Sequence, residues 1–444
     1  QFKLDANFLG ASDTSAPYGV SWNTVATTNG FHTLTAIARD AAGHQRAVSI
    51  IVNVANGVVS PPPPPPTPTP TPTPTPPPGA TNNIWISQSE LSSRPTNGAA
   101  WDNVKATADG SWGSPDLANQ ESLHPQNVLA GALVYARTGQ TPYRDKVISA
   151  LNSIKGTESG ARSLALGRNL AAYAIAADLV GYTDPGFKSF MSDIRNRQNS
   201  EGRTLITCHQ DRPNNWGTMC GASRIAIDRY IGDTADLDQA AKVFRGWVGD
   251  RTTYAGFKFQ SVAFSWMCDT ANPRPVNPIG CMKLGHDLSG ALVDDVSRAG
   301  SFTWPPVSTG YAWGGLSAAI AQAEMLHRAG YSAFEWEGQA IRRAATFNII
   351  NKYDLANAAD WAPWIVNYRY GTTFSGGSGD GRLMSFTDWT HASSPTPPPP
   401  SSLPPSATLQ VVLQASPRSG AAPLGGVDLI AAVAGTAPGT INYT

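Results

Sequence analysis

Four residue types in the middle of the sequence could together carry out an elimination reaction beside a carboxylate. Asn214 and Asn215 lie on a proline-containing turn directly before a stretch with helical periodicity, and Tyr311 opens another such stretch. His286 and Arg298 lie between them in the sequence. Amide, imidazole and guanidinium groups can hold a carboxylate, and a tyrosine can accept and return a proton. We therefore expect a site that binds a carboxylate and moves a neighbouring proton.

Cleavage of a polyuronate by β-elimination needs such a site, because it requires both a bound carboxylate and the transfer of a neighbouring proton. The C5 proton beside the charged carboxylate is hardly acidic, because its removal would place a second negative charge on the same group. Hydrogen-bond donors and cations around the carboxylate stabilise that developing charge, and arginine adds a bidentate fork. A base must then reach the C5 proton, and an acid must protonate the departing O4. One tyrosine can do both when nearby cations favour its ionised form.

Each of these five residues also has a purely structural interpretation. Asn214 or Asn215 could simply cap the helix that follows, although the same helix end favours an anion. His286 could bind the carboxylate, take the proton, or be an ordinary structural histidine. Arg298 could pair with the aspartate four residues earlier. Tyr311 lies among tryptophans, which suit a sugar-binding cleft and a protein core alike.

Other polar and aromatic residues at expected helix starts or exposed faces could line subsites for neighbouring sugars. These are His124, Gln126, Asn127, Arg168, Asn169, His209, Trp216, Trp313, Trp364, Tyr368 and Arg369. The elimination chemistry requires no metal, and no acidic cluster in the sequence demands one, so we expect no cofactor.

The ends of the chain differ in pattern from its middle. Residues 1–56 alternate polar and apolar positions between turn signals, which is typical of a small antiparallel β-sandwich, and they are similar to bacterial immunoglobulin-like repeats. Residues 57–81 form a Pro/Thr-rich linker, and residues 393–406 form a shorter Pro/Ser-rich one. Residues 407–444 begin a second sandwich-like module. We interpret the two ends as separate, truncated accessory modules.

Residues 82–392 switch to helical periodicity. Helices are expected near 184–197, 216–231, 234–248, 309–329 and 334–350, in addition to earlier ones that end at Gly139 and near Gly181. Many of these stretches are rich in Ala and Gly, which permits close helix–helix approach. Consecutive helical hairpins in a nearly all-α domain favour an α/α toroid, an incomplete barrel around a central cleft. A flat helical solenoid is the alternative, but no fixed repeat period is visible.

The four cysteines suggest an exported protein. The short spacings between Cys208 and Cys220 and between Cys268 and Cys281 favour two local disulfides, although four cysteines allow three pairings. A zinc site is the alternative, because His209 adjoins Cys208, but the tight spacing of zinc-binding cysteines is missing.

The charge balance excludes some functions. Lys and Arg total 32, and Asp and Glu also total 32. Nucleic acids and acidic membrane surfaces call for a basic excess, whereas an acidic sugar needs only a local cluster. No apolar run approaches the roughly twenty residues of a membrane span. The first residues look like the interior of a strand rather than a signal peptide, so we expect a processed, secreted monomer.

Several separated motifs resemble the alginate-lyase superfamily, and in particular polysaccharide lyase family 38. The motifs are Ala132 to Gly139, Arg168 to Tyr173, Asn214 to Gly217 and Trp364 to Gly371, within a likeness that covers residues 85–375. Members of the family cleave glucuronan-type polymers, including cellouronate, and in some cases alginate. The resemblance implies an α/α toroid, a carboxylate clamp formed by Asn215, His286 and Arg298, and Tyr311 as base and acid.

The resemblance is not complete. Related alginate lyases with an Asn-Asn-His turn carry a histidine directly after the amides, whereas this chain has Trp216. The carboxylate-binding histidine must then come from elsewhere, with His286 as first choice and His209 as second. A single tyrosine works on one face of the sugar and gives syn elimination. The C5 proton and O4 are syn in β-1,4-glucuronate and mannuronate but anti in guluronate, so glucuronan is the expected substrate and mannuronan the second.

Two other functions compete with the lyase. A glycoside hydrolase on the same toroid would use two carboxylates, for which the candidates are Asp287, Asp294, Asp295 and Glu324. A non-catalytic polysaccharide-binding protein would agree with the flanking modules.

Overall fold

The computed structural model describes residues 1–5, 7–13, 19–28, 30–39, 45–54, 84–355, 359–377, 381–392, 409–416 and 427–435. Both predicted linkers, 57–81 and 393–406, lie outside these residues. The chain forms two compact units. One unit comprises residues 1–70 and 397–444, and the other comprises residues 71–396.

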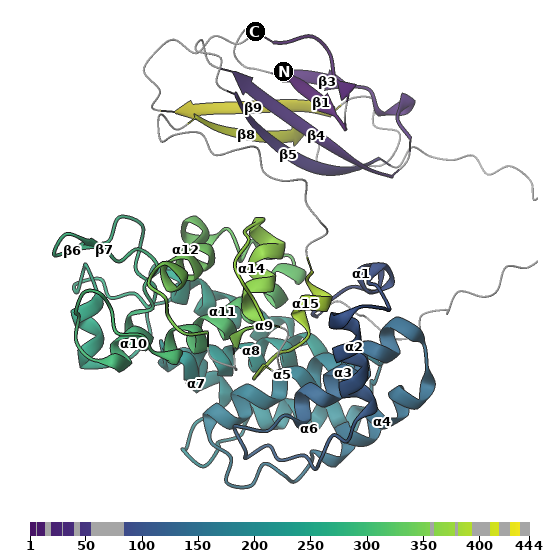
Figure 1. The fold of residues 1–444 in the computed structure, drawn as a ribbon, viewed down its shortest axis with the longest axis vertical. Coiled ribbons are helices and arrows are strands. Elements are labelled where there is room, and N and C mark those ends of the chain that lie inside the picture. Colours follow the sequence, from purple (N-terminus) through teal and green to yellow (C-terminus); the bar gives the residue numbers. More distant parts are fainter. Residues whose placement is uncertain are drawn as a thin grey trace, which may run out of the picture. The chain divides into compact units, whose positions relative to one another are not determined.

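The described strands of the first unit form two antiparallel sheets. One has the order β2-β1-β4-β5, and the other has the order β3-β9-β8 (Figure 1). The strands are β1 (Phe2–Leu4), β2 (Asn7–Phe8), β3 (Gly19–Trp22), β4 (Gly30–Arg39), β5 (Gln45–Val54), β8 (Leu409–Ser416) and β9 (Val427–Gly435), with a short 3₁₀ helix η1 (Thr24–Ala26) after β3. Alternate residues of β4 are buried, namely Leu34, Ala36 and Ala38, so the period-two pattern of the sequence corresponds to one covered face.

The two ends of the chain share this unit, which differs from the expectation of two separate modules. Strand β3 pairs with β9, with Gly19 opposite Ile430 and Trp22 opposite Val427. An edge strand leaves a row of backbone N–H and C=O groups unpaired. The pairing of β3 with β9 satisfies such groups across the two segments, which the local pattern of either segment alone does not reveal.

The second unit is mainly helical, as predicted. Its helices are α1 (Gln88–Ser93), α2 (Ala99–Asp109), α3 (His124–Thr138), α4 (Thr141–Ser153), α5 (Ser163–Leu179), α6 (Pro185–Asn196), α7 (Leu205–Asp211), α8 (Asn215–Ile231), α9 (Thr234–Val248), α10 (Val293–Val296), α11 (Gly310–Arg328), α12 (Trp336–Ile350), α14 (Ala362–Tyr370) and α15 (Thr387–Thr390). The predicted helical stretches correspond to α6, α8, α9, α11 and α12. Within the described residues, no helix is both long and apolar enough to cross a membrane.

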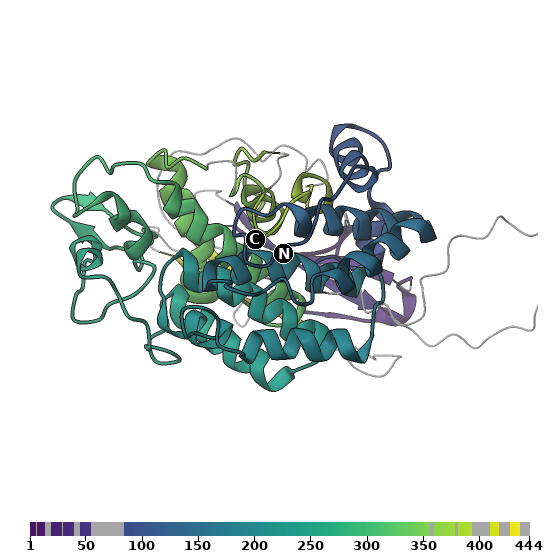
Figure 2. The ribbon, with the colours of Figure 1, turned by 90° about the horizontal axis from the view of Figure 1, so that it is seen from below.

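Helix α8 packs against both α5 and α11. Figure 1 labels these three helices, and Figure 2 shows the same fold from below. The close approach of α5 to α8 depends on Gly167, where an added Cβ would lie 2.9 Å from the backbone nitrogen of Cys220. Ser223 of α8 donates a hydrogen bond of 2.9 Å to the Gly167 carbonyl and accepts one of 2.9 Å from the N–H of Ala171. Small residues and a buried hydroxyl therefore connect the two helices.

Local capping sets the start of both helices that open near the expected site. The side chain of Asn214 accepts a hydrogen bond of 3.2 Å from the N–H of Trp216 at the start of α8. Thr309 does the same for the N–H of Tyr311 at the start of α11, at 3.3 Å. At its other end α8 stops at Gly232, which adopts a left-handed conformation with φ of 85°.

The segment between α9 and α11 is largely irregular. It contains two 3₁₀ helices, η2 (Ser261–Trp266) and η3 (Ser297–Ala299), and the small hairpin of β6 (Met282–Lys283) and β7 (His286–Asp287). A disulfide joins Cys268 and Cys281 beside this hairpin, as the short spacing predicted.

The second expected disulfide is absent: Cys208 and Cys220 are buried free thiols. The sulfur of Cys208 is directed to the carbonyl of Trp216, and that of Cys220 to the carbonyl of Ser163, each at 3.5 Å. The prediction from spacing was therefore wrong for this pair, although the two thiols lie close enough to interact.

Candidate functional site

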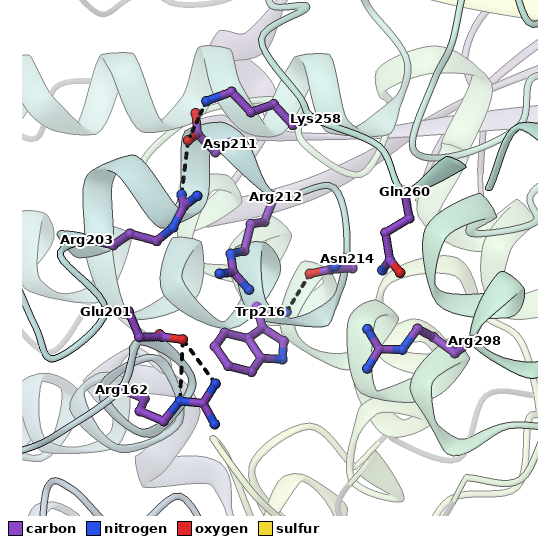
Figure 3. A pocket seen from close by; sticks show the side chains of 10 residues that line it. All are labelled: Arg162, Glu201, Arg203, Asp211, Arg212, Asn214, Trp216, Lys258, Gln260 and Arg298. Atoms are coloured by element: carbon purple, nitrogen blue, oxygen red, sulfur yellow. Dashed lines mark hydrogen bonds and ion pairs between the residues drawn. The ribbon is translucent and has the colours of Figure 1, made fainter. Parts of the chain in front are cut away.

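Two adjoining cavities lie around the start of α8. The first, which we call the Tyr311 cavity, has a volume of about 440 Å³ and is lined by Gln120, Glu121, Arg162, Leu164, Arg168, Asn215, Trp216, Met219, Arg298, Gly310, Tyr311, Gly314, Leu355 and Ala359. The second, the Arg212 cavity, has a volume of about 390 Å³ and is lined by Arg162, Glu201, Arg203, Asp211, Arg212, Asn214, Trp216, Lys258, Gln260 and Arg298 (Figure 3). Arg162, Trp216 and Arg298 line both.

Three of the four residues predicted to do chemistry line the Tyr311 cavity. Asn215 comes from the start of α8, Arg298 from η3, and Tyr311 from the start of α11. The guanidinium carbon of Arg298 lies 4.4 Å from the centroid of the Tyr311 ring. Tyr311 is 41% exposed, so the phenol is accessible from the cavity. An amide, a guanidinium and an accessible phenol are thereby brought to one place.

The alternative pairing of Arg298 with Asp294 does not occur. Within the part of the chain that the structure describes, Arg298 forms no ion pair. Asp294 instead accepts hydrogen bonds of 3.0 Å from the Asn214 side-chain amide and from both the backbone and the side-chain amide of Gln260. Arg298 therefore keeps its donors for a ligand.

Two buried aspartates of α10 hold the turn that carries the asparagines. Asp294 binds the side chain of Asn214, and Asp295 accepts a hydrogen bond of 3.0 Å from the backbone N–H of Asn215. Burial raises the pKa of Asp295 well above its ordinary value, and the Asn215 N–H opposes this shift. The side-chain oxygen of Asn215 is buried without a partner among the described residues. Asn214 thus caps α8, whereas the unpaired side-chain oxygen of Asn215 can only accept a hydrogen bond, so a carboxylate at this place would have to be bound by the NH₂ group of the same side chain.

Helix α11 approaches this turn closely. A Cβ added at Gly315 would collide with the carboxylate of Asp295, whereas one at Gly314 would lie 4.0 Å from the nearest atom, the Cβ of Asn215. Because Gly315 has no side chain, α10 can pack closely against α11, one turn after Tyr311. This contact sets the position of Asn215 relative to Tyr311.

Arg168 and Trp216 also line the Tyr311 cavity, as the sequence suggested. Arg168 donates hydrogen bonds of 3.2 Å to the Gln120 carbonyl and to the Glu121 carboxylate. Burial lowers the pKa of Arg168. The ring of Trp216 lies 4.8 Å from the guanidinium carbon of Arg162 and 4.5 Å from that of Arg212.

The predicted carboxylate-binding histidines lie elsewhere. His286 is in β7, and its ring stacks on Trp304 with 4.4 Å between the centroids and 14° between the planes. It lies outside the lining of both cavities. His209 is buried behind α8, where Arg224 approaches its ring to 3.4 Å and burial lowers its pKa well below the ordinary value. Neither histidine meets Asn215 and Arg298, because the irregular segment and the packing of α7 direct them away.

Most of the other predicted binding residues have partners within the fold, whereas the side-chain oxygen of Gln126 is buried without one among the described residues. His124 lies 2.7 Å from the Tyr173 hydroxyl, and Asn169 donates to the Asn119 carbonyl at 3.0 Å. The remaining partners are the Trp112 carbonyl for Asn127, the Tyr353 carbonyl for Trp313, the Gly377 carbonyl for Trp364, Glu90 for Tyr368 and Glu324 for Arg369. None of these residues lines the two cavities, although Asn169 supports the loop that carries Gln120.

Several cavity residues were not identified from the sequence. Arg162, Arg203, Arg212, Lys258 and Gln260 line the Arg212 cavity. Only Arg212 carried a usable signal, since it directly precedes the turn with the two asparagines. The others come from loops whose neighbours in space are set by packing.

Comparison with known proteins adds nothing to this geometry, because no protein family and no curated protein matches the sequence. Among the described residues, no group of three or more His, Cys, Asp or Glu side chains is arranged to hold a metal ion. The fold and the cavities together define a mainly helical unit with two adjoining cavities rich in basic side chains, one of which contains Tyr311.

Proposed function

We propose that this chain is a secreted polysaccharide lyase that cleaves β-1,4-linked polyuronates by syn β-elimination. Glucuronan, including cellouronate, is the first substrate and mannuronan the second, and the products are 4,5-unsaturated oligouronates. The observation that carries the proposal is the presence of Asn215, Arg298 and Tyr311 in one cavity. Its three basic side chains, Arg162, Arg168 and Arg298, outnumber its one acidic side chain, Glu121.

The residues of this cavity have distinct roles in the proposed reaction. Arg298 and the side chain of Asn215 bind the substrate carboxylate and stabilise the charge that develops when C5 loses its proton. The phenolate form of Tyr311 takes this proton, the bond between C4 and O4 breaks, and a C4–C5 double bond forms. The phenol then returns the proton to the departing O4. Base and acid are one group, so both events occur on the same face of the sugar.

The finer description of the fold belongs to the same proposal. Neighbouring helices joined by short connections, such as α3 with α4 and α8 with α9, agree with an α/α toroid of helical hairpins. The two small antiparallel sheets agree with an immunoglobulin-like sandwich. The Cys268–Cys281 disulfide favours an oxidising, extracellular location.

The carboxylates favour a lyase over a glycoside hydrolase. Of the four candidate carboxylates, Asp294, Asp295 and Glu324 are each at most 1% exposed and line neither cavity. Asp287 is exposed, but it also lies outside the lining of the two cavities. Every carboxylate that lines the two cavities has a basic partner: Glu121 pairs with Arg168 and Arg382, Glu201 with Arg162, and Asp211 with Arg203 and Lys258. A hydrolase needs an acid and a base or nucleophile that are free to act on the substrate.

The test is the growth of ultraviolet absorbance on glucuronan, mannuronan and guluronan, with Tyr311→Phe measured in parallel. Absorbance growth on glucuronan that falls at least 100-fold in the variant is the expected result, in line with loss of general acid–base catalysis. Tyr143→Phe is the matched control, because its hydroxyl binds Asp109 outside both cavities. Reducing ends without unsaturated product would instead establish a hydrolase, and polymer binding without cleavage a binding protein.

A further inference from the structure

The Arg212 cavity contains an excess of basic side chains, most of which have no role in the proposed elimination step. Five basic side chains line it, Arg162, Arg203, Arg212, Lys258 and Arg298, against two acidic ones, Glu201 and Asp211. Like charges repel one another, so such an excess within one cavity is stabilised when an anion occupies it.

The pairing pattern shows which cations remain available. Arg162 pairs with Glu201 at 3.1 Å, while Arg203 and Lys258 share Asp211 at 3.0 and 2.9 Å. Within the described residues, Arg212 and Arg298 form no ion pair. The two unpaired guanidinium groups both point toward Trp216 (Figure 3).

Trp216 holds Arg212 in a geometry suited to a carboxylate. The guanidinium carbon of Arg212 lies 4.5 Å from the centroid of the indole ring. A guanidinium group that lies over an aromatic face keeps the donors along its edge free, and two of them match the two oxygens of a carboxylate. The indole ring therefore orients Arg212 without consuming its hydrogen bonds.

The two cavities adjoin at Arg162, Trp216 and Arg298. The Arg212 cavity is therefore the space next to the one in which Arg298, Asn215 and Tyr311 would meet a uronate. We propose that Arg212 binds the carboxylate of the uronate adjacent to the one that undergoes elimination, so that the enzyme selects two consecutive uronates. This inference rests on the proposed lyase function and makes Arg212 a residue that determines specificity.

Two β-1,4-linked polymers distinguish this arrangement from general attraction of polyanions. Cellouronate has a carboxylate on every sugar, whereas a polymer in which glucuronate alternates with glucose has none on the adjacent sugar. A charge-assisted contact at the second sugar should give the wild-type protein a kcat/KM about 10- to 100-fold higher on cellouronate, per glucuronate residue.

Arg212→Gln should reduce this ratio between the two polymers to nearly one. Arg212→Lys keeps a charge but loses the planar fork, so it should give an intermediate ratio of kcat/KM on the two polymers. It also provides a second measurement of the role of Arg212 if the glutamine variant folds poorly. Arg245→Gln is the matched control and should keep the wild-type ratio, because Arg245 pairs with Asp250 at 2.9 Å outside both cavities.

The outcomes separate this inference from the function on which it rests. A wild-type protein without preference, or an Arg212→Gln variant that loses activity equally on both polymers, would overturn the role of Arg212 and leave the lyase intact. Absence of unsaturated product from either polymer with the wild-type protein would overturn the lyase and this inference together.

Discussion

The guanidinium group of Arg298 lies over the ring of Tyr311, with its carbon 4.4 Å from the ring centroid. The two residues come from η3 and α11, and neither side chain is buried. The contact holds an accessible phenol beside an unpaired cation at the border of the two cavities. In the proposed reaction this places the group that moves the proton next to the group that binds the carboxylate.

Arg298→Gln should lower kcat/KM on glucuronan by about 100-fold, because the developing charge on the carboxylate loses its cation. Arg298→Lys should recover only part of this loss, since an ammonium group lacks the planar fork and stacks less well on Tyr311. Steady-state kinetics on glucuronan measure both effects. An unchanged thermal midpoint is expected, because Arg298 is exposed; full activity in the glutamine variant would contradict the assigned role.

Asp295 should tolerate replacement by its neutral isostere but not truncation. Burial raises the pKa of Asp295, so the neutral acid is favoured, and Asp295→Asn keeps an oxygen for the Asn215 N–H. Asp295→Ala leaves that buried N–H unpaired and should cost about 1–3 kcal/mol of unfolding free energy. Urea denaturation monitored by circular dichroism compares the two variants. Equal losses in both would show that the charge of Asp295 is needed.

Gly315 and Gly314 form a matched pair on α11. Gly315→Ala should lower the unfolding free energy by about 1–3 kcal/mol, because the added Cβ collides with the buried carboxylate of Asp295. Gly314→Ala should leave stability unchanged or slightly improved, since its Cβ meets the nearest atom only at 4.0 Å and alanine favours a helix. Thermal unfolding of both variants measures the difference, and similar stability in the two would refute the close contact.

His286→Ala should leave kcat/KM nearly unchanged, because the side chain lies outside the lining of both cavities. Its ring stacks on Trp304 rather than facing Asn215. The comparison is made on glucuronan alongside Arg298→Gln. A loss as large as that of the arginine variant would restore His286 to the carboxylate-binding role that the family resemblance implied.

Acid should destabilise the fold through His124. Burial lowers its pKa from the ordinary 6.5 to about 4, so between these values the unfolded chain binds a proton that the folded protein does not. Stability therefore falls as the pH drops from about 6.5 to about 4 and should not fall further through this group at lower pH.

His124→Asn should flatten that dependence in part, as measured by urea denaturation at intervals between pH 7 and 4. His209 and His391 are also buried with lowered pKa values, so they contribute a slope of the same sign that remains in the variant. A slope that the substitution leaves unchanged would rule out His124 as a contributor.

Much of the helical unit could be predicted from local patterns. The starts of α8 and α11 carry a capping side chain, and the ends of α3 and α8 carry a glycine, which are signals contained in a few adjacent residues. Asn215 and Tyr311 were identifiable for the same reason, since each lies at such a helix start. The mainly helical character was confirmed, while the toroid remains a prediction.

Contacts between distant segments could not be predicted in the same way. The sequence alone determined where several helices begin and which residue types are available for binding a carboxylate. It favoured the Cys268–Cys281 bridge, but by the same spacing it also favoured a Cys208–Cys220 bridge that does not form. Only the tertiary structure decided that Arg212 and Arg162 approach Trp216, that His286 stacks on Trp304, and that β3 pairs with β9. Local order depends on backbone preferences within a few residues, whereas a binding site depends on how buried groups such as Asp295 and Gly315 bring separate helices together.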